Sequence, residues 1–339
     1  MKVVVYQPDM EERLREFVQQ ADNATPAHMI EWRNILETAA GLSTHYLVAQ
    51  ENGSIVGMLP LALVRAPMGK GRLVSLPYLS HGGICAQGEA AEHALLSAAR
   101  KMAVAYRAPV ELRGPTGFSQ LPTRRDKARL VLDISNGPEQ VWRHLRSEIR
   151  NRIRKGRNSG LHTVVGGEEL LPAFYSVFCH RMTSLGTPPH PLRFFQELLR
   201  NMPETRVIVV YNGMGTAAGA VLCFFRDCAE VPWVASRSEF LPICPNQVLY
   251  WEAIKFACQQ GAKRFDFGRS TVGSGTFVFK QRWGAKPEPL AWQYVFPDNR
   301  AEPDGSPGPA LVMASKIWRH LPVAAARALG PLVRRYLAE

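Results

Sequence analysis

The chain has 339 residues and a formal net charge of +12, from 41 basic and 29 acidic side chains. A hydrophobic share of 46% is ordinary for a globular protein, and no apolar run approaches the ~18 residues that a membrane-spanning helix needs. The length favours two domains, and the charge favours an anionic partner: nucleic acid, an acidic membrane surface or a phosphorylated substrate.

The cysteines and the first residues favour a cytoplasmic protein. The six cysteines show no CxxC spacing, and most lie in apolar runs, as small buried residues do in a reducing compartment. The N-terminus has neither an apolar h-region nor a small-residue cleavage site, so we expect no signal peptide. We predict a cytoplasmic location, with the inner face of the cytoplasmic membrane as an alternative.

The first part of the chain mixes helical and strand patterns. Apolar residues at helical spacing predict helices, and alternating runs around Asn52-Gly53 predict a hairpin. A turn is expected at Met68-Gly69-Lys70-Gly71, and a glycine-rich loop follows at 79–84. The predicted elements are a strand at 3–5, helices at 10–20 and 28–39, a hairpin over 46–64, a strand at 73–76, a helix at 90–106, and strands at 110–113 and 129–134.

A basic helix is predicted to connect this part to a second one. It starts at Gly137-Pro138 and frays near residue 158. Its buried face comprises Trp142, Leu145, Ile149 and Ile153, and its basic face comprises Arg146, Arg150, Arg154 and Arg157. The basic face is either solvated or directed at RNA or a membrane; no aromatic residue interleaves it, so base stacking is not indicated.

The same order of elements is then predicted again, which indicates a structural repeat. The second set is a strand at 161–165, helices at 168–182 and 192–201, a hairpin over 206–225, a strand at 230–235, a helix at 246–260, and strands at 264–267, 276–282 and 289–296. A linker rich in Pro, Gly, Asp and Ser follows at 297–309. Residues 310–339 are amphipathic and basic and are broken by Pro322 and Pro331, which suits either an anionic membrane surface or packing on the protein's own body.

Several classes of site are disfavoured by motif. Gly268-Arg269-Ser270 resembles the start of a nucleophile elbow, but Val272 occupies the position where the motif has glycine. The nine histidines are scattered and no His-Glu-x-x-His occurs, so no metal site is expected. Gly273-Ser274-Gly275 precedes a predicted strand and is interpreted as a flexible loop.

The start of the helix at 246–260 is a candidate anion site. Asn246 and Gln247 follow a strand and open the helix, where free N–H groups and the helix dipole can meet a pyrophosphate. The Arg/Gln-x-x-Gly-x-Gly motif of acyl-CoA transferases is absent. Asn246 as a simple N-cap is an equally good interpretation.

The segment from Phe265 to Gly284 holds the best catalytic candidates. Strand alternation places Asp266 opposite its two phenylalanine neighbours, where a carboxylate can orient or deprotonate an amine. Lys280 and Arg282 alternate with Phe279 and Gln281 and could point together toward an oxyanion or a phosphate. The alternative is a structural Asp–Arg pair that stabilises a turn.

The run Phe-Asp-Phe-Gly-Arg-Ser, its Gly-rich loop and Phe-Lys-x-x-Trp-Gly resemble the C-terminal signature of FemAB-related proteins, in particular those associated with the exosortase/PEP-CTERM system. Further matching stretches are Arg150–Leu161, Met182–Pro188, Pro245-Asn246 leading to Trp251, and Leu76–Gly83. The resemblance extends to about Phe296. It implies an α+β fold with two GNAT-like lobes, each a mixed, mostly antiparallel sheet flanked by helices.

The resemblance also implies a reaction. Members of the family transfer acyl or aminoacyl groups to amines, and their motif lysine, which binds the donor and stabilises the transition state, corresponds to Lys280. We therefore expect an N-acyltransferase that moves an acyl group from an acyl-CoA-type donor to an amine of a cell-envelope or exopolysaccharide precursor, with no permanently bound cofactor. A transferase that uses aminoacyl-tRNA and a non-catalytic glycan-binding scaffold remain alternatives; tRNA is disfavoured because no long helical hairpin interrupts the second lobe.

The expected organisation and site complete these predictions. The first lobe spans 1–137, the connecting helix 138–160 and the second lobe 161–296, followed by the linker at 297–309 and the C-terminal segment at 310–339. Catalysis is assigned to Lys280 and Asp266. The residues expected to bind substrate are Arg269, Ser270, Arg282 and Trp283 in the second lobe and Ser80, His81 and Arg113 in the first, with Asn246 and Gln247 for the acyl-CoA.

Overall fold

The computed structural model describes residues 1–65, 71–114, 117–298 and 309–337. The chain divides into two compact units, one formed by Met1–Lys127, Pro289–Ser306 and Val333–Glu339 and the other by Ala128–Glu288 and Pro307–Leu332. The chain passes from one unit to the other inside β7 (Thr123–Asp133) and returns inside β13 (Lys286–Val295). The turn expected at Met68–Gly71 and the linker expected at 297–309 lie mostly outside the described residues.

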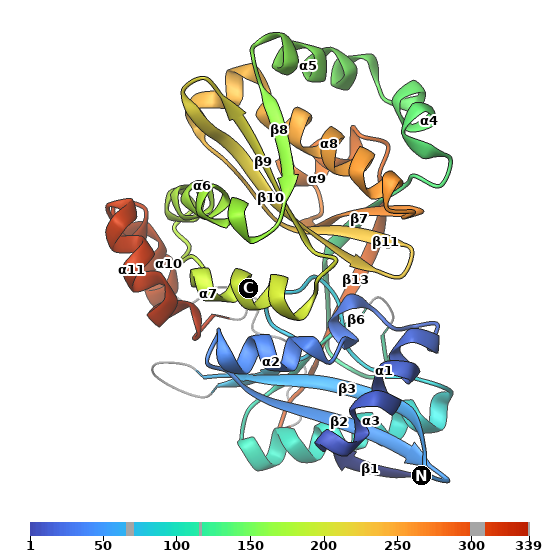
Figure 1. Cartoon of the computed structure of the whole chain (residues 1–339). Helices are drawn as coiled ribbons and strands as arrows, with labels where there is room; N and C mark the ends of the chain where they lie inside the picture. The colour runs from blue at the N-terminus through green and yellow to red at the C-terminus, as the bar shows by residue number, and fades with distance from the viewer. Residues whose placement is uncertain (66–70, 115–116, 299–308, 338–339) are drawn as a thin grey trace. The chain divides into compact units, whose positions relative to one another are not determined.

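The first unit is built on a sheet with the strand order β1-β2-β3-β4-β6-β13 (Figure 1). Its elements are β1 (Lys2–Val5), α1 (Glu11–Gln20), α2 (Glu31–Thr38), β2 (Ser43–Glu51), β3 (Ser54–Val64), β4 (Arg72–Val74), β5 (Cys85–Ala86), α3 (Glu89–Tyr106) and β6 (Val110–Gly114). The β2–β3 hairpin turns at Asn52 and Gly53, which both have positive φ, as a tight two-residue turn requires. Helix α3 buries Leu95, Leu96 and Ala99 in a core shared with the sheet.

The second unit has the strand order β7-β12-β11-β10-β9-β8. Its elements are α4 (Gly137–His144), α5 (Ser147–Asn158), β8 (His162–Gly166), α6 (Leu171–Ser184), α7 (Leu192–Asn201), β9 (Arg206–Asn212), β10 (Gly215–Phe225), β11 (Cys228–Ser236), α8 (Pro245–Gln259), β12 (Arg264–Thr271), α9 (Gly275–Gln281), α10 (Pro309–Trp318) and α11 (Val323–Arg334). These bounds agree with the predicted order of elements except in two places.

Helices cover both faces of the second sheet. On β10, Ala218 and Ala220 share a core with helices α5 and α8. The intervening Gly219 faces the other way, where an added Cβ would lie 3.0 Å from the Phe174 ring of α6. There, Phe194 and Phe195 of α7 and the nearby His190 pack around Trp233 of β11. Packing on both faces therefore fixes the positions of β10, β11 and their neighbours.

The single connecting helix predicted from Gly137 is wrong, because the structure has two helices there, α4 and α5. The backbone is extended at Leu145 and Arg146, and Arg150 Nη1 donates to the carbonyls of Trp142, Arg143 and Leu145 at 3.3, 3.0 and 2.8 Å. This side chain satisfies carbonyls that the break in the helix would leave without donors.

Most of the predicted basic face is occupied by contacts within the unit. Besides Arg150, Arg154 lies 5.6 Å from the ring centre of Trp142, and Arg157 pairs with Glu252 at 2.8 Å. These arginines therefore contribute to packing and capping, and less of their charge is available to a polyanion than the sequence indicates.

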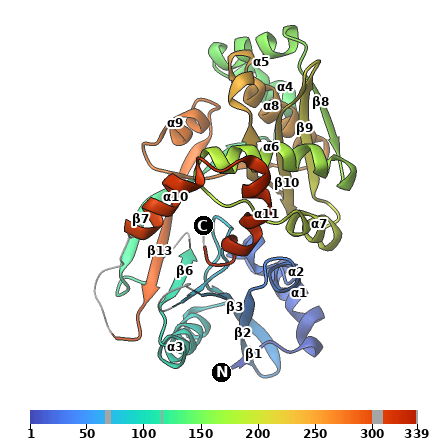
Figure 2. The same ribbon diagram turned by 90° about the vertical axis from the view of Figure 1, so that its left-hand side faces the viewer.

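The C-terminal segment packs on the second unit through one side. Figures 1 and 2 show α11 beside α6. Ala326 of α11 is fully buried, and the Arg327 guanidinium lies 5.3 Å from the ring centre of Tyr175 on α6. Pro322 separates α10 from α11 as expected, but Pro331 lies inside α11 and does not end it. On α10, Leu311, Val312, Met313 and Ile317 are exposed, and Met313 and Ile317 lie one turn apart on the same side. No helix in the described ranges has the length and apolarity needed to cross a membrane.

Candidate active site

The second sheet opens between its two central parallel strands. Within the described part of this unit, β11 and β12 pair only through Cys228–Glu230 and Arg264–Asp266. Beyond that point, β11 continues to Ser236 and β12 to Thr271 without pairing to each other. The facing edges therefore do not satisfy each other's backbone groups, and a ligand that enters between the strands can bond those that remain free.

A β-bulge lies at the point where the strands separate. Opposite β10, Trp233 pairs with Val221 and Glu230 pairs with Cys223, so Val231 and Pro232 together face the single residue Leu222. A bulge bends its strand and re-aims the adjacent side chains. Pro232 has no N–H, so Val231 is the one of the two bulged residues that carries a backbone donor.

Two buried carboxylates meet at the last paired position. Glu230 and Asp266 are Cα partners on the neighbouring strands, are 5% and 1% exposed, and have carboxylate oxygens within 4.8 Å of each other. Asp266 Oδ1 accepts the Gly268 N–H at 2.8 Å, and its Oδ2 lies 3.4 Å from Arg129 Nη1. Burial raises the pKa of the Asp266 carboxyl, and the Arg129 guanidinium and the Gly268 N–H oppose that shift.

Lys280 lies beside this pair on helix α9, where the sequence predicted a strand. Ser274 caps the helix by accepting the Phe277 N–H at 3.3 Å, and Gly284 with φ +87° follows its end. The alternating apolar residues resemble a strand, but the cap and the packing of Phe279 and Trp283 on the core select a helix. Positions two apart on a helix point in nearly opposite directions, so Lys280 and Arg282 do not converge as expected.

The Lys280 ammonium is buried and directed at β12. Its Nζ donates to the carbonyls of Gly268 and Arg269, both at 2.9 Å, and the side chain is 8% exposed. Burial lowers the pKa of Lys280 to about 8, against the opposing attraction of Asp266 and Glu230. An ammonium has three N–H donors, so one remains after these two bonds.

Of the other second-unit residues expected to bind substrate, two lie on β12 near the site and two lie elsewhere. Ser270 is buried on β12, and its Oγ has no hydrogen-bond partner among the described residues. Arg269 lies between Ser270 and Gly268 on the same strand. Arg282 instead pairs with Glu148 at 3.4 Å on a half-exposed surface. Trp283 is buried among Tyr250, Phe267 and Phe279, which makes it part of the core.

Asn246 and Gln247 lie in the first turn of α8 as expected, but neither is its N-cap. Cys244, with φ +63°, occupies the N-cap, and Pro245 is the first helical residue. The Asn246 Oδ1 atom is buried and has no hydrogen-bond partner in the described part of the chain, while Gln247 is 6% exposed. The first turn contains no acidic residue, so the positive end of the helix dipole is not neutralised there.

The candidate residues of the first unit lie around one buried arginine. Arg113 is fully buried, and it donates to Glu111 Oε1 at 2.7 Å and to the Leu79 carbonyl at 3.2 Å. Its guanidinium also lies 4.3 Å from the ring centre of Trp292. Ser80 and His81 are buried in the loop that this arginine anchors. We interpret Arg113 as a residue that positions the loop rather than one that contacts a substrate.

Sequence reasoning missed three charged members of the second-unit site. Glu230 lies in the apolar run of β11, and a lone carboxylate in such a run was the available signal. Arg129 of β7 pairs with Asp266 and also with Glu288 at 2.5 Å. Arg129 and Glu288 could be placed near Asp266 only from the order of the strands in the sheet, and the sequence alone does not give that order.

Comparison with known proteins defines the class of fold. Residues 143–281 match the family model described as an acetyltransferase (GNAT) domain, and they include the carboxylate pair and Lys280. The crystal structure of FemX superposes with a TM-score of 0.67 at 13% identity, over 86% of this chain and 97% of that one. A tandem GNAT protein from the clavulanic acid biosynthesis pathway superposes with a TM-score of 0.54 at 11% identity, over 86% and 97%.

A third similar structure is the C-terminal domain of a putative lysylphosphatidylglycerol synthetase from Agrobacterium fabrum. Its TM-score is 0.57 at 12% identity, and the match covers 91% of this chain and 96% of that domain. No curated protein matches the sequence. The fold is thus a mixed α/β fold of the tandem GNAT type, as predicted, and the second unit carries the part that matches the GNAT acyltransferase domain.

Proposed function

We propose that the protein is an N-acyltransferase that moves an acyl group from an acyl-CoA-type thioester to an amine at the opening between β11 and β12. The observation that carries this proposal is that the opening begins at the buried Glu230–Asp266 pair, beside Lys280, inside the segment that matches the GNAT domain. An open pair of strand edges can hold an extended thioester by backbone hydrogen bonds, as a sheet holds an added strand.

The proposed chemistry is attack of a neutral amine on the thioester carbonyl. Asp266 accepts the proton that the amine loses, and a raised pKa makes its carboxylate a better base at neutral pH than an ordinary aspartate. The third N–H of Lys280 and the Val231 N–H stabilise the tetrahedral oxyanion. When the C–S bond breaks, the thiolate leaves and takes up a proton, so the products are an amide and a free thiol.

The first turn of α8 is the proposed pyrophosphate site of the donor. Its N–H groups follow the diverging end of β11, and no carboxylate lies in that turn. Asn246 can rotate its amide so that either the oxygen or the nitrogen faces a ligand. This assignment predicts that a donor lacking the pyrophosphate binds much more weakly than the complete acyl-CoA.

The test is to measure binding of acetyl-CoA and longer acyl-CoAs by calorimetry, and transfer to amines by release of free thiol. Saturable acyl-CoA binding that Asn246→Asp weakens by about tenfold or more, through repulsion of the phosphates, supports the proposal. Gln260→Asp, at the other end of α8, is the matched control and should leave binding unchanged. Binding of charged tRNA without binding of any thioester would select the aminoacyl-tRNA alternative.

The acceptor and the location are finer parts of the same proposal. The sequence resemblance favours an amine of a cell-envelope or exopolysaccharide precursor as acceptor. Such precursors are commonly held at a membrane, and the exposed apolar side of α10 offers a means of reaching it. Peripheral attachment of this helix to an anionic bilayer is therefore included in the proposal and is tested separately.

A further inference from the structure

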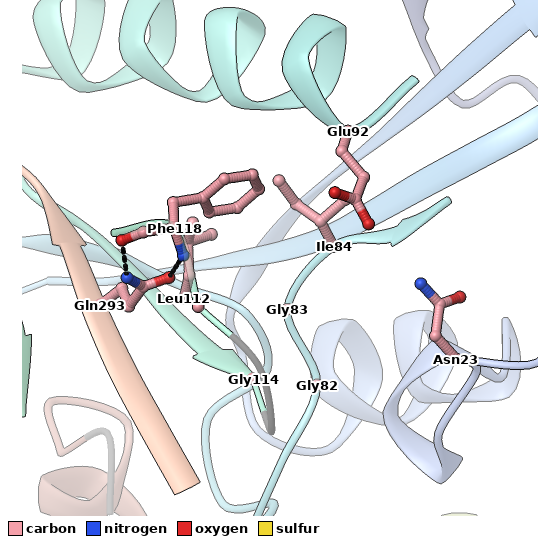
Figure 3. Close-up of a pocket in the computed structure, with 10 residues that line it drawn as sticks. Asn23, Gly82, Gly83, Ile84, Glu92, Leu112, Gly114, Phe118 and Gln293 are labelled. Atoms are coloured by element: carbon pink, nitrogen blue, oxygen red, sulfur yellow. Dashed lines mark hydrogen bonds between the residues drawn. The ribbon is translucent and has the colours of Figure 1, made fainter. Parts of the chain in front are cut away.

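The first sheet also has two parallel strands that diverge, and a cavity lies in the same unit. Among the described residues, β4 and β6 pair through Leu73 and Val74 with Val110 and Glu111, and beyond this point the Gly82 N–H donates to the Arg113 carbonyl. The chain then leaves the sheet and returns at β5, which pairs with β3. The cavity has a volume of about 180 Å³ and is lined by Ile84, Glu92, Leu112, Phe118 and nearby glycines (Figure 3).

The amide side chains at this cavity are engaged in holding its walls. Gln293 accepts the Phe118 N–H at 2.7 Å and donates to the Phe118 carbonyl at 2.6 Å and to Thr123 Oγ1 at 3.0 Å. Asn23 donates to the Ala86 carbonyl at 3.3 Å and accepts from Cys85 Sγ at 3.1 Å. These bonds fix the apolar wall formed by Phe118 and the loop that carries Ile84.

Glu92 is the charged side chain of the lining, and its carboxylate remains available. It lies in the first turn of α3 and extends toward the cavity (Figure 3). Within the described part of the chain, no hydrogen bond or ion pair engages it. A carboxylate at a half-buried position gains most from a cationic partner that can donate hydrogen bonds.

The two units differ in the charge that they present after the diverging strands. Helix α3 has Glu89 and Glu92 in its first turn, whereas the first turn of α8 has no acidic residue. A phosphate at the start of α3 would face these carboxylates, so the first unit is unsuited to the pyrophosphate proposed for the second. The glycine and apolar walls leave room for a compact ligand, since a cavity of about 150 Å³ accepts a benzene ring.

We propose that this cavity binds the ammonium group of a small, ring-sized organic amine, with Glu92 as its ion-pair partner and Ile84, Leu112 and Phe118 against the body of the ligand. The site is separate from the transfer site proposed above, and its occupancy is independent of acyl transfer.

The test uses calorimetry on the full chain with two matched pairs of probes: cyclohexylammonium against cyclohexanol, and D-glucosamine against D-glucose. In at least one pair, the amine should bind more tightly than its uncharged partner by about tenfold or more. Glu92→Gln should remove that preference. Glu89→Gln, in the same turn but outside the lining, should retain it.

A second variant tests the cavity itself. Ile84→Trp fills the space and should abolish binding of the same amine although Glu92 is intact. Lys280→Met should bind the amine as the wild type does, which separates this inference from the transferase proposal. Equal affinities within both pairs, no binding of any probe at millimolar concentration, or amine binding that survives Glu92→Gln or Ile84→Trp would overturn the inference.

Discussion

Glu230 and Asp266 face each other on neighbouring parallel strands at the last paired position before the strands diverge. Both are buried and their carboxylate oxygens lie within 4.8 Å of each other. Burial raises the pKa of the Asp266 carboxyl, and a neighbouring negative charge acts in the same direction. We therefore expect Glu230 to make Asp266 a better proton acceptor at neutral pH.

Exchanging each carboxylate for its amide separates the proposed role of Asp266 as the base from that of Glu230 as the neighbouring charge. Asp266→Asn should lower kcat by about 100-fold or more, because it removes the proposed base. Glu230→Gln should move the acidic limb of the kcat–pH profile to lower pH, because it removes the neighbouring negative charge. Glu252→Gln, which disrupts surface ion pairs on α8, is the control. An acidic limb at the same pH in wild type and Glu230→Gln would refute the coupling.

Lys280→Met should reduce activity. The variant leaves the Gly268 and Arg269 carbonyls without their donor, a cost of about 1–3 kcal/mol that is offset at neutral pH because the penalty for burying the ammonium is also removed. Loss of the oxyanion donor should lower kcat by about 100-fold or more. Arg282→Met removes a half-exposed ion pair and should change kcat by less than about threefold. Transfer by Lys280→Met within a few-fold of wild type would mean that Lys280 is structural only.

The pH dependence of stability reports on the Lys280 ammonium. Its pKa in the folded protein is about 8, below the ordinary value of 10.5, so between these values the unfolded chain binds more protons. The penalty for burying the charge is therefore complete below about pH 8 and is relieved as the pH rises toward 10.5. Relative to Lys280→Met, the wild type should gain up to about 3 kcal/mol across this window. Urea unfolding of both proteins at the two ends of the window measures the gain, and a constant difference between them would show that burial does not lower this pKa.

The order of elements was predictable from sequence because apolar residues recur at helical spacing in the helices and alternate in the strands. Most of the expected helices and strands occur at their predicted positions. The strand predicted at 276–282 was wrong because Phe277 and Phe279 lie two positions apart, as residues on one face of a strand do. The better signals were Ser274 as an N-cap and Gly284 at the end of the helix. The local motif around Asp266 was also recognisable. Its partners Glu230 and Arg129 come from other strands, and the parallel register that joins them depends on packing across the whole sheet.

The exposed side of α10 should attach the protein to anionic bilayers. Met313 and Ile317 are 57% and 60% exposed and lie one turn apart, near Lys316. Burying an apolar side chain of this size contributes about 1.5–3 kcal/mol, so Met313→Glu with Ile317→Glu should reduce vesicle binding by about tenfold or more. Point variants are preferable to deletion of 310–339, because α11 packs on the second unit through Ala326.

Co-sedimentation with vesicles of phosphatidylcholine alone and with added phosphatidylglycerol measures this attachment. The wild type should bind the anionic vesicles more strongly, and added salt should weaken that binding because the electrostatic part is screened. Val104→Glu replaces an equally exposed apolar residue on α3 and serves as the matched control. If the double variant and the wild type sediment alike, or if neither binds anionic vesicles, the apolar side of α10 does not bind lipid.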